Sequence, residues 1–450
     1  MFSGFYEFHD GDPPNSSFRF PEVTIDDFRC SRCKFSWERK CVACYPLETI
    51  RGKLGHIRNL RMDVRVSVEA LDFLLDIMPN VRALSLTFEI IDDKLFRSLP
   101  SYLEPRREIT RLDLGHSDIP RGLFTAVMGA CSKSLKEFQT YSFWWTDDHY
   151  AAIGACTELR TLELRGEWGT LGNVQLKMML VGLRNLKSLV VVPCFDLTDE
   201  NLSMILKLEE LERLELCSKT SFPHTFMRYL GKRTTLRHLK LEQRGQRIDA
   251  QLVQTFVGLP NLRTLFLHSK NLAPECLDLI CATFESLEDL CLGEIPDFTD
   301  ADGRKFVKLR NLRSLSLESA VGLTDLTFEG KVGSATMDKL RIHGSPLTDA
   351  SLASIAVNHP RLKRLDLGAC SKITDAGLVS LLEREPYLEH LDVRFLDSVS
   401  GRWIEAMDKL CPRLRFMNTD SMATYRSFRE RRRSVKAEWS PRLRDGVYFR

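Results

Sequence analysis

One short phrase recurs along almost the whole chain and limits what the chain can fold into. The pattern L-x-x-L-x-L begins at seven positions, namely Leu159, Leu211, Leu236, Leu262, Leu287, Leu312 and Leu362. Looser copies begin at Ile57, Val81, Ile109, Leu135, Leu186, Met337, Leu388 and Leu414. Neighbouring copies begin 24 to 28 residues apart, so the chain contains fifteen copies of one repeat.

Each repeat predicts a short strand, a loop and a helix. The L-x-L alternation places Leu on one face of a strand and the intervening residues on the other. Thr–Asp pairs such as Thr324–Asp325 follow the strand, and both residue types cap free amides of a first helical turn. Prolines such as Pro360 then end the helix. We therefore predict an α/β solenoid, shaped as a horseshoe, with a parallel inner sheet and outer helices.

The repeats resemble a known family. The segment LKRLDLGACSKITDAGLVSLL (362–382) is similar to the consensus of leucine-rich repeats of the cysteine-containing, RNI-like subtype. The resemblance covers about residues 57–420 and implies the solenoid fold. The Cys or Asn expected eight residues after the first Leu occurs only as Cys194 and Cys370, so capping of the other loops must be irregular. Proteins of this kind are often F-box proteins, which are substrate receptors of cullin–RING ubiquitin ligases.

The two ends differ from the repeats, so we predict three parts: an N-terminal lead-in with a Cys-rich cap (1–56), the solenoid (57–420) and a basic tail (421–450). The lead-in has some F-box character in Phe20–Pro21 and in Cys33 with Trp37. This span is about half the length that three helices require, and we find no intact F-box. The motif is lost, divergent or missing from this chain if the protein belongs to that family.

Four cysteines cluster near the N-terminus. Cys30, Cys33, Cys41 and Cys44 form a C-x2-C-x7-C-x2-C array, and two close Cys pairs can supply the thiolates of a tetrahedral zinc site. The central spacing is short beside that of typical zinc ribbons. Two interpretations stay open, a structural zinc and free thiols in a helical cap.

The third, fifth and seventh residues of each phrase are predicted to face the inner side. Two groups there are candidates for partner binding. One is a basic stretch for an acidic partner, consisting of Lys339, Arg341, His343, Arg364 and Arg394. Asp366 and Asp392 lie among these residues and should largely neutralise them. The other is an aromatic anchor of Tyr141, Trp144 and Trp168, because Trp and Tyr concentrate at binding hot spots. The alternatives are a solvated sheet face and the packing of irregular loops.

Composition excludes several classes of protein. The 64 basic and 61 acidic residues leave a formal charge of +3, which gives no overall attraction to nucleic acid or to an anionic membrane. We find no membrane span and no signal peptide. The thirteen cysteines are an odd number and mostly scattered, which favours reduced thiols in the cytoplasm or nucleus. The tail is either a nuclear-import or phosphate-binding element or a solvated cap.

The sequence contains no phosphate loop, no H-E-x-x-H and no G-x-S-x-G motif, so we expect no enzyme and no cofactor beyond the zinc. We predict a non-enzymatic protein-interaction module whose concave face holds a protein. The resemblance implies a substrate receptor or adaptor of a cullin–RING ubiquitin ligase, with the ligase's adaptor as a second partner. The alternative is a stand-alone scaffold with a zinc-stapled cap. Neither alternative requires a membrane or direct contact with nucleic acid.

Overall fold

The structure is a computed structural model, and it consists of two compact units, Met1–Arg213 (unit 1) and Leu214–Arg450 (unit 2). It describes residues 22–24, 58–62, 80–86, 109–115, 121–141, 145–165, 171–194, 199–218, 220–243, 247–330, 332–334, 336–400, 402–421, 424–426 and 436–439. None of the helices in these ranges is long and apolar enough to cross a membrane.

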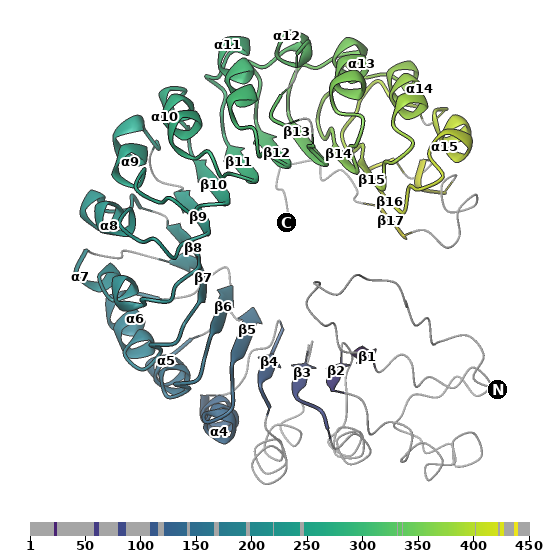
Figure 1. The fold of residues 1–450 in the computed structure, drawn as a ribbon. Helices are drawn as coiled ribbons and strands as arrows, with labels where there is room; N and C mark the ends of the chain where they lie inside the picture. Colours follow the sequence, from purple (N-terminus) through teal and green to yellow (C-terminus); the bar gives the residue numbers. More distant parts are fainter. Residues whose placement is uncertain are drawn as a thin grey trace, which may run out of the picture. The chain divides into compact units, whose positions relative to one another are not determined.

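Unit 1 contains a parallel sheet with helices on one side (Figure 1). Its strands are β1 (Glu22–Thr24), β2 (Asn59–Met62), β3 (Ala83–Leu86), β4 (Arg111–Asp113), β5 (Glu137–Tyr141), β6 (Thr161–Arg165) and β7 (Ser188–Cys194). Its described helices are α4 (Arg121–Cys131), α5 (Asp147–Gly154), α6 (Asn173–Leu180), α7 (Asp199–Leu202) and the 3-10 helix η2 (Ile205–Lys207).

Unit 2 repeats the same alternation of strand and helix. Its strands are β8, which begins at the unit boundary (Arg213–Ser218), β9 (His238–Gln243), β10 (Thr264–Ser269), β11 (Asp289–Gly293), β12 (Ser314–Glu318), β13 (Lys339–His343), β14 (Arg364–Asp366), β15 (His390–Asp392), β16 (Phe416–Thr419) and β17 (Lys436–Trp439). Its helices are α8 (His224–Leu230), α9 (Ala250–Thr255), α10 (Glu275–Thr283), α11 (Asp300–Gly303), η3 (Arg304–Lys308), α12 (Asp325–Phe328), α13 (Asp349–Asn358), α14 (Asp375–Arg384) and α15 (Ile404–Leu410).

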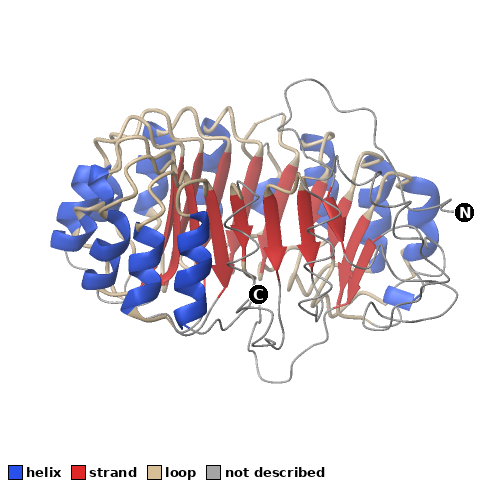
Figure 2. Ribbon diagram, turned by 90° about the horizontal axis from the view of Figure 1, so that it is seen from below, coloured by secondary structure: helices blue, strands red, loops and turns tan. Residues whose placement is uncertain are grey.

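The predicted fold class, an α/β solenoid with a parallel sheet, is confirmed. Strands β2 to β16 coincide one for one with the fifteen predicted repeats. Two described strands lie beyond the predicted repeats, one at each end. β1 pairs in parallel with β2, and β17 pairs in parallel with β16. In each unit the strands form one layer and the helices the other (Figure 2).

The core lies between these two layers. The fourth residue of the phrase is buried on strand after strand, as Leu239, Leu265, Leu290, Leu315 and Leu340 show with 0–1% exposure. Parallel pairing in register aligns these residues in one apolar row, which the helices cover. Cys131, Cys156 and Cys276 share this environment, and burial raises the pKa of each thiol to about 12. These three thiols are packing groups.

A backbone ladder aligns the second residue of each phrase. The amide of Arg82 donates to the carbonyl of Arg58 over 2.7 Å, and the amide of the next residue, Ala83, donates to the same oxygen over 3.0 Å. The pair of bonds recurs in later repeats, for example from Arg263 and Thr264 to Arg237. Since each of these carbonyls accepts two amides, the second position of these repeats is held at the start of its strand.

The chain leaves the strands of unit 2 through a left-handed residue. The eighth residue of the phrase has a positive φ in five successive repeats, at Glu294, Ser319, Gly344, Ala369 and Phe395. Only Gly344 is a glycine, and the others accept an angle of 55–59° that L side chains seldom adopt. Identical geometry in consecutive repeats identifies it as the regular exit from the strand.

The Thr–Asp signature does more than cap helices. Asp325, at the start of α12, accepts hydrogen bonds from the amide of Thr348 (2.9 Å), the hydroxyl of Thr348 (2.6 Å) and the hydroxyl of Ser351 (2.7 Å), all in the next repeat. Asp300 binds Thr324 and Thr327 in the same way. Burial acts to raise the pKa of Asp325, but the hydrogen bonds outweigh it and lower the pKa below its ordinary 3.8. The aspartates therefore link each repeat to the next.

We predict that Asp325→Ala lowers the free energy of unfolding by ~1–3 kcal/mol at pH 7, because three hydrogen bonds to a charged group are lost. Urea titration followed by circular dichroism measures this. Since the folded-state pKa of Asp325 is lowered, its contribution is present above pH 3.8 and is lost as pH falls further, so the difference should shrink in acid. Glu329→Ala, an exposed change in the same segment, is the control. A loss in Asp325→Ala no larger than in this control would contradict the linking role.

One buried carboxyl departs from the repeat pattern. Three residues before the first Leu, other repeats place Leu259 or Leu309, but the repeat of β15 places Glu385, which is 0% exposed. Among the described residues neither of its carboxyl oxygens has a hydrogen-bond partner. Burial raises the pKa of Glu385 to about 8 from an ordinary 4.5. Glu385 is therefore mainly protonated in the folded protein at neutral pH.

We predict that Glu385→Gln removes a pH dependence of stability. With a raised folded-state pKa, the native chain holds a proton that the unfolded chain loses, so the stability of the unmodified protein falls as pH rises from 4.5 to about 8. Between pH 5 and pH 8 the variant should gain ~1–3 kcal/mol relative to the unmodified protein. Glu383→Gln, an exposed change in α14, should give no such gain in denaturant titrations at the two pH values. Parallel pH profiles for all three proteins would refute the prediction.

Candidate partner-binding surface

The inner face of unit 2 contains an aligned row of polar and charged side chains. Strand pairing places the fifth-position residues of five successive phrases side by side, namely Ser316, Arg341, Asp366, Asp392 and Asn418. Arg341 forms ion pairs with Asp366 (Nε to Oδ2, 2.9 Å) and with Glu318 (NH1 to Oε1, 3.3 Å). We call the five fifth-position residues the middle row. The charge of Arg341 in this row is neutralised by the two carboxylates beside it.

The same cancellation continues towards β16. Arg394 pairs with Asp392 (NH2 to Oδ2, 2.6 Å), and the amide nitrogen of Asn418 donates to the same oxygen over 3.1 Å. Burial and the charge of Asp392 raise the pKa of Asp366 to about 6, against the lowering effect of Arg341. The charges of the middle row are thus largely compensated by ion pairs, and the row is a poor source of free charge.

A second row on this face is different. The third residues of the phrases align as Lys339, Arg364, His390 and Phe416, and we call these four residues the outer row. Lys339 and Arg364 are exposed, and neither has an ion pair with another described residue. The rings of His390 and Phe416 lie 5.3 Å apart between centroids. Burial and the nearby Arg364 lower the pKa of His390, so His390 is neutral at pH 7.

The seventh position contributes histidines that lie against glycine. A side chain at Gly368 would place its Cβ 2.7 Å from Cδ2 of His343, and one at Gly293 would meet His268 at 2.8 Å. Glycine therefore lets each ring lie on the backbone of the next repeat. Burial and Arg341 lower the pKa of His343, so this side chain adds no positive charge at neutral pH.

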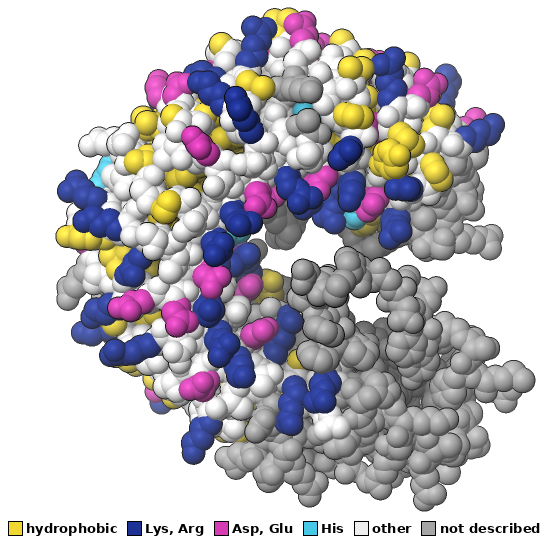
Figure 3. Space-filling view, in the orientation of Figure 1, with side chains coloured by type: hydrophobic (Ala, Val, Ile, Leu, Met, Phe, Trp, Pro, Cys, Tyr) yellow, Lys and Arg dark blue, Asp and Glu magenta, His cyan; other side chains and the backbone are white. Residues whose placement is uncertain are grey.

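Only two of the five residues in the predicted basic stretch offer free positive charge in the structure. Lys339, Arg341 and His343 lie on β13 and Arg364 lies on β14, whereas Arg394 follows the end of β15. Arg341 and Arg394 are neutralised by their carboxylates, and His343 is uncharged. Only Lys339 and Arg364 offer positive charge to a partner. Figure 3 shows Lys, Arg, Asp and Glu side chains alternating along this margin.

The aromatic anchor is described in part. Tyr141 is half-buried at the end of β5, where it pairs with Arg165 of β6. Trp144 and Trp168 lie outside the described residues, as do Cys30, Cys33, Cys41 and Cys44. The aromatic patch and the zinc site therefore stay predictions.

Trp145, which follows the predicted anchor residue Trp144 in the chain, lies among aromatic side chains. Its ring lies 5.4 Å from Phe124, 5.4 Å from His149 and 5.5 Å from Tyr150, between centroids. These contacts join the start of α5 to α4 of the preceding repeat. Trp145 thus contributes to packing rather than to a binding surface.

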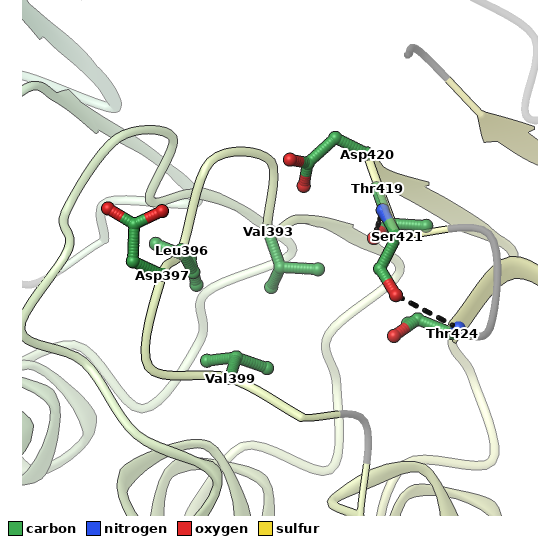
Figure 4. Close-up of a pocket in the computed structure, with 8 residues that line it drawn as sticks. All are labelled: Val393, Leu396, Asp397, Val399, Thr419, Asp420, Ser421 and Thr424. Atoms are coloured by element: carbon green, nitrogen blue, oxygen red, sulfur yellow. Dashed lines mark hydrogen bonds between the residues drawn. The ribbon is translucent and has the colours of Figure 1, made fainter. Parts of the chain in front are cut away.

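A small cavity lies at the loop edge of the last repeats. It has a volume of about 250 Å³ and is lined by Val393, Leu396, Asp397, Val399, Thr419, Asp420, Ser421 and Thr424. Figure 4 shows three apolar side chains on one side and the Thr419–Thr424 segment on the other, where the amide of Thr424 donates to Ser421 Oγ over 3.2 Å. In the described ranges no three His, Cys, Asp or Glu side chains come together as a metal site.

The third, fifth and seventh positions of the phrase do not include all the aligned rows of side chains on the strands. The second residue of each phrase also forms an aligned row, at the edge where the strands begin, because of the double hydrogen bonds described above. Writing the fifteen repeats beneath one another would have shown that this position is mostly Arg or Lys.

Comparison with known proteins gives no family. No protein-family model matches the chain, and no curated protein matches it. Among solved structures, the chain is similar to one described as the crystal structure of the Rad7 and Elc1 complex in yeast. The identity is 16%, the alignment covers 87% of this chain and 80% of that chain, and the TM-score is 0.44. Values this low carry no functional argument.

Proposed function

We propose that the protein is a non-enzymatic receptor that holds a segment of a partner protein on the inner strand face of unit 2. The observation that carries this proposal is the outer row. Two exposed cations, Lys339 and Arg364, stand beside the ring pair of His390 and Phe416 on adjacent strands. Cationic and aromatic side chains on a rigid, regular surface are typical of protein-binding sites.

The middle row supports the same interpretation. Because Arg341 and Arg394 are already paired with carboxylates, these half-buried charges need no partner to neutralise them. They hold the strand face in one arrangement in the free protein. A partner that docks on the outer row then meets a preorganised surface and loses less entropy on binding.

We propose further that this receptor serves as a substrate receptor or adaptor of a cullin–RING ubiquitin ligase. The support is the resemblance of the repeats to those of F-box leucine-rich-repeat proteins. In this role unit 2 holds the substrate, and the N-terminal segment contacts the ligase's adaptor. We propose the cytoplasm or nucleus as its compartment, because eight cysteines of the described repeats, from Cys131 to Cys411, are free thiols.

Affinity purification from the native cell tests the ligase role. We expect the full chain to recover a cullin and its adaptor, and a chain without its N-terminal 55 residues to lose both while it keeps its substrate. Recovery of neither from the full chain, together with one zinc per chain by metal analysis, would instead support the stand-alone scaffold with a zinc-stapled cap.

The receptor surface has its own test. We expect Lys339→Glu with Arg364→Glu to weaken capture of the substrate about tenfold or more in quantitative pull-downs, because both free cations become anions. Arg384→Glu with Lys409→Glu is the control, since it makes the same charge change at exposed positions of the outer helices α14 and α15. Equal capture of the substrate by the two double variants would show that the inner face of unit 2 is not the binding surface.

A further inference from the structure

A second charged row, on unit 1, is independent of the surface proposed above. It consists of the second residues of six consecutive phrases, which we call the edge row: Arg58, Arg82, Thr110, Lys136, Arg160 and Lys187. Five of the six are basic and none is acidic. We propose that the edge row is a docking site for an extended acidic segment of a partner protein.

The backbone sets the geometry of the edge row. Each second-position amide donates to the second-position carbonyl of the preceding repeat, over 2.7 Å for Arg82 to Arg58 and 2.8 Å for every later step through Lys187. The third-position amide binds the same carbonyl, over 3.0 Å for Thr161 to Lys136 and 2.9 Å for Ser188 to Arg160. The six side chains therefore leave the sheet at one edge with the ~4.8 Å spacing of adjacent strands.

The charges of the edge row are largely unneutralised. Arg58, Lys136 and Arg160 are exposed and Arg82 is half-buried. Within the described part of the chain none of these four has an ion pair. Only Lys187 at the end of the row is paired, with Glu212 (3.3 Å) and Glu210 (3.8 Å).

The acidic side chains nearby are few and partly engaged. Glu137, next to Lys136, forms an ion pair with Arg111 at 3.6 Å, and Glu158 is an exposed neighbour of Arg160. Figure 3 shows Lys and Arg side chains over the strands of unit 1 with acidic side chains among them. The excess of positive charge thus lies along one line, the edge row.

Unit 2 has the same backbone ladder without the same charge. Its second positions begin with Arg237 and alternate in sign from Arg263 to Arg415. Arg263 pairs with Glu288 (2.7 Å) and Arg313 with Asp338 (3.2 Å) across neighbouring repeats. Identical geometry therefore gives a self-neutralised row in unit 2 and an unneutralised one in unit 1. The edge row is not a general consequence of the fold.

An extended acidic peptide fits this row in length and width. Six strands ~4.8 Å apart span roughly 24 Å, which an extended chain covers with about seven residues. Such a chain presents a side chain to the same side every ~6.7 Å, so three or four carboxylates can face the row. Long Lys and Arg side chains absorb the difference in spacing.

A nucleic acid fits less well. In the described strands of unit 1 the third and fifth positions contain no aromatic side chain on which a base could stack. Asp113 and Glu163, at the fifth position, lie two rows inward and repel a second line of phosphates. A partner that complements the edge row presents a single line of negative charge. An extended acidic peptide has one such line, whereas a duplex has two lines of phosphates.

Fluorescence anisotropy on the full chain tests the proposal. The probe is a labelled peptide of about twelve residues in which Glu and Ser alternate, so that extended geometry places every carboxylate on one side. We expect Lys136→Glu with Arg160→Glu to weaken binding of this peptide about tenfold or more, and Lys136→Gln with Arg160→Gln to weaken it about threefold. Added salt should weaken binding to the unmodified protein and affect the Glu variant less.

The matched control is Lys363→Glu with Arg415→Glu, which makes the same charge change at exposed second positions of unit 2. Binding within about twofold of the unmodified protein in this control, and weakened binding in the unit 1 variants, supports the proposal. Equal effects of the Lys136/Arg160 and Lys363/Arg415 variants overturn it. Tighter binding of a single-stranded oligothymidylate of equal charge, lost in the Lys136/Arg160 variant, overturns the choice of a peptide in favour of nucleic acid. If the Lys136→Glu/Arg160→Glu variant loses the native circular dichroism spectrum, the Lys136→Gln/Arg160→Gln variant is compared with the Lys363/Arg415 control instead.

Discussion

Everything in this structure depends on parallel pairing of one short strand with the same strand of the next repeat. A single repeat exposes both its apolar row and its strand edges, so it becomes stable only by stacking on its neighbours. In-register pairing places Leu on Leu, as in Leu265 beside Leu290 and Leu290 beside Leu315. The same register also aligns every other position of the repeat. Rows of side chains on the surface are therefore a by-product of core formation.

Two kinds of polar bond strengthen this stacking. Carbonyls at the second position accept two amides each, and aspartates at the helix starts accept hydroxyl and amide donors from the following repeat. Both act between repeats, on opposite sides of the apolar row. The surface rows can consequently vary in charge without affecting the fold. That freedom explains how unit 2 has a neutralised middle row while unit 1 has an unneutralised edge row.

Much of the fold could be predicted from particular residues, and part of the candidate site could not. The L-x-x-L-x-L phrases predicted fifteen strands, and β2 to β16 match them. Asp325 was recognised as a helix-start residue, but its three bonds to the next repeat depend on how two repeats meet. Likewise the five basic residues from Lys339 to Arg394 were predicted to share a face. That Arg341 is held by Glu318 and Asp366 follows from side-chain reach between strands, which the phrase does not encode.

The sequence alone determined the repeat, its period and therefore the order of strands and helices, because hydrophobic periodicity is a local property of the chain. It also determined which residue type occupies each repeat position. Tertiary structure decided which charges cancel and which stay available, because ion pairs form between residues about 25 positions apart that meet only when the strands align. Lys339, Arg364 and the edge row differ from Arg341 in their neighbours on adjacent strands, not in their own chemistry. Those neighbours are created by stacking.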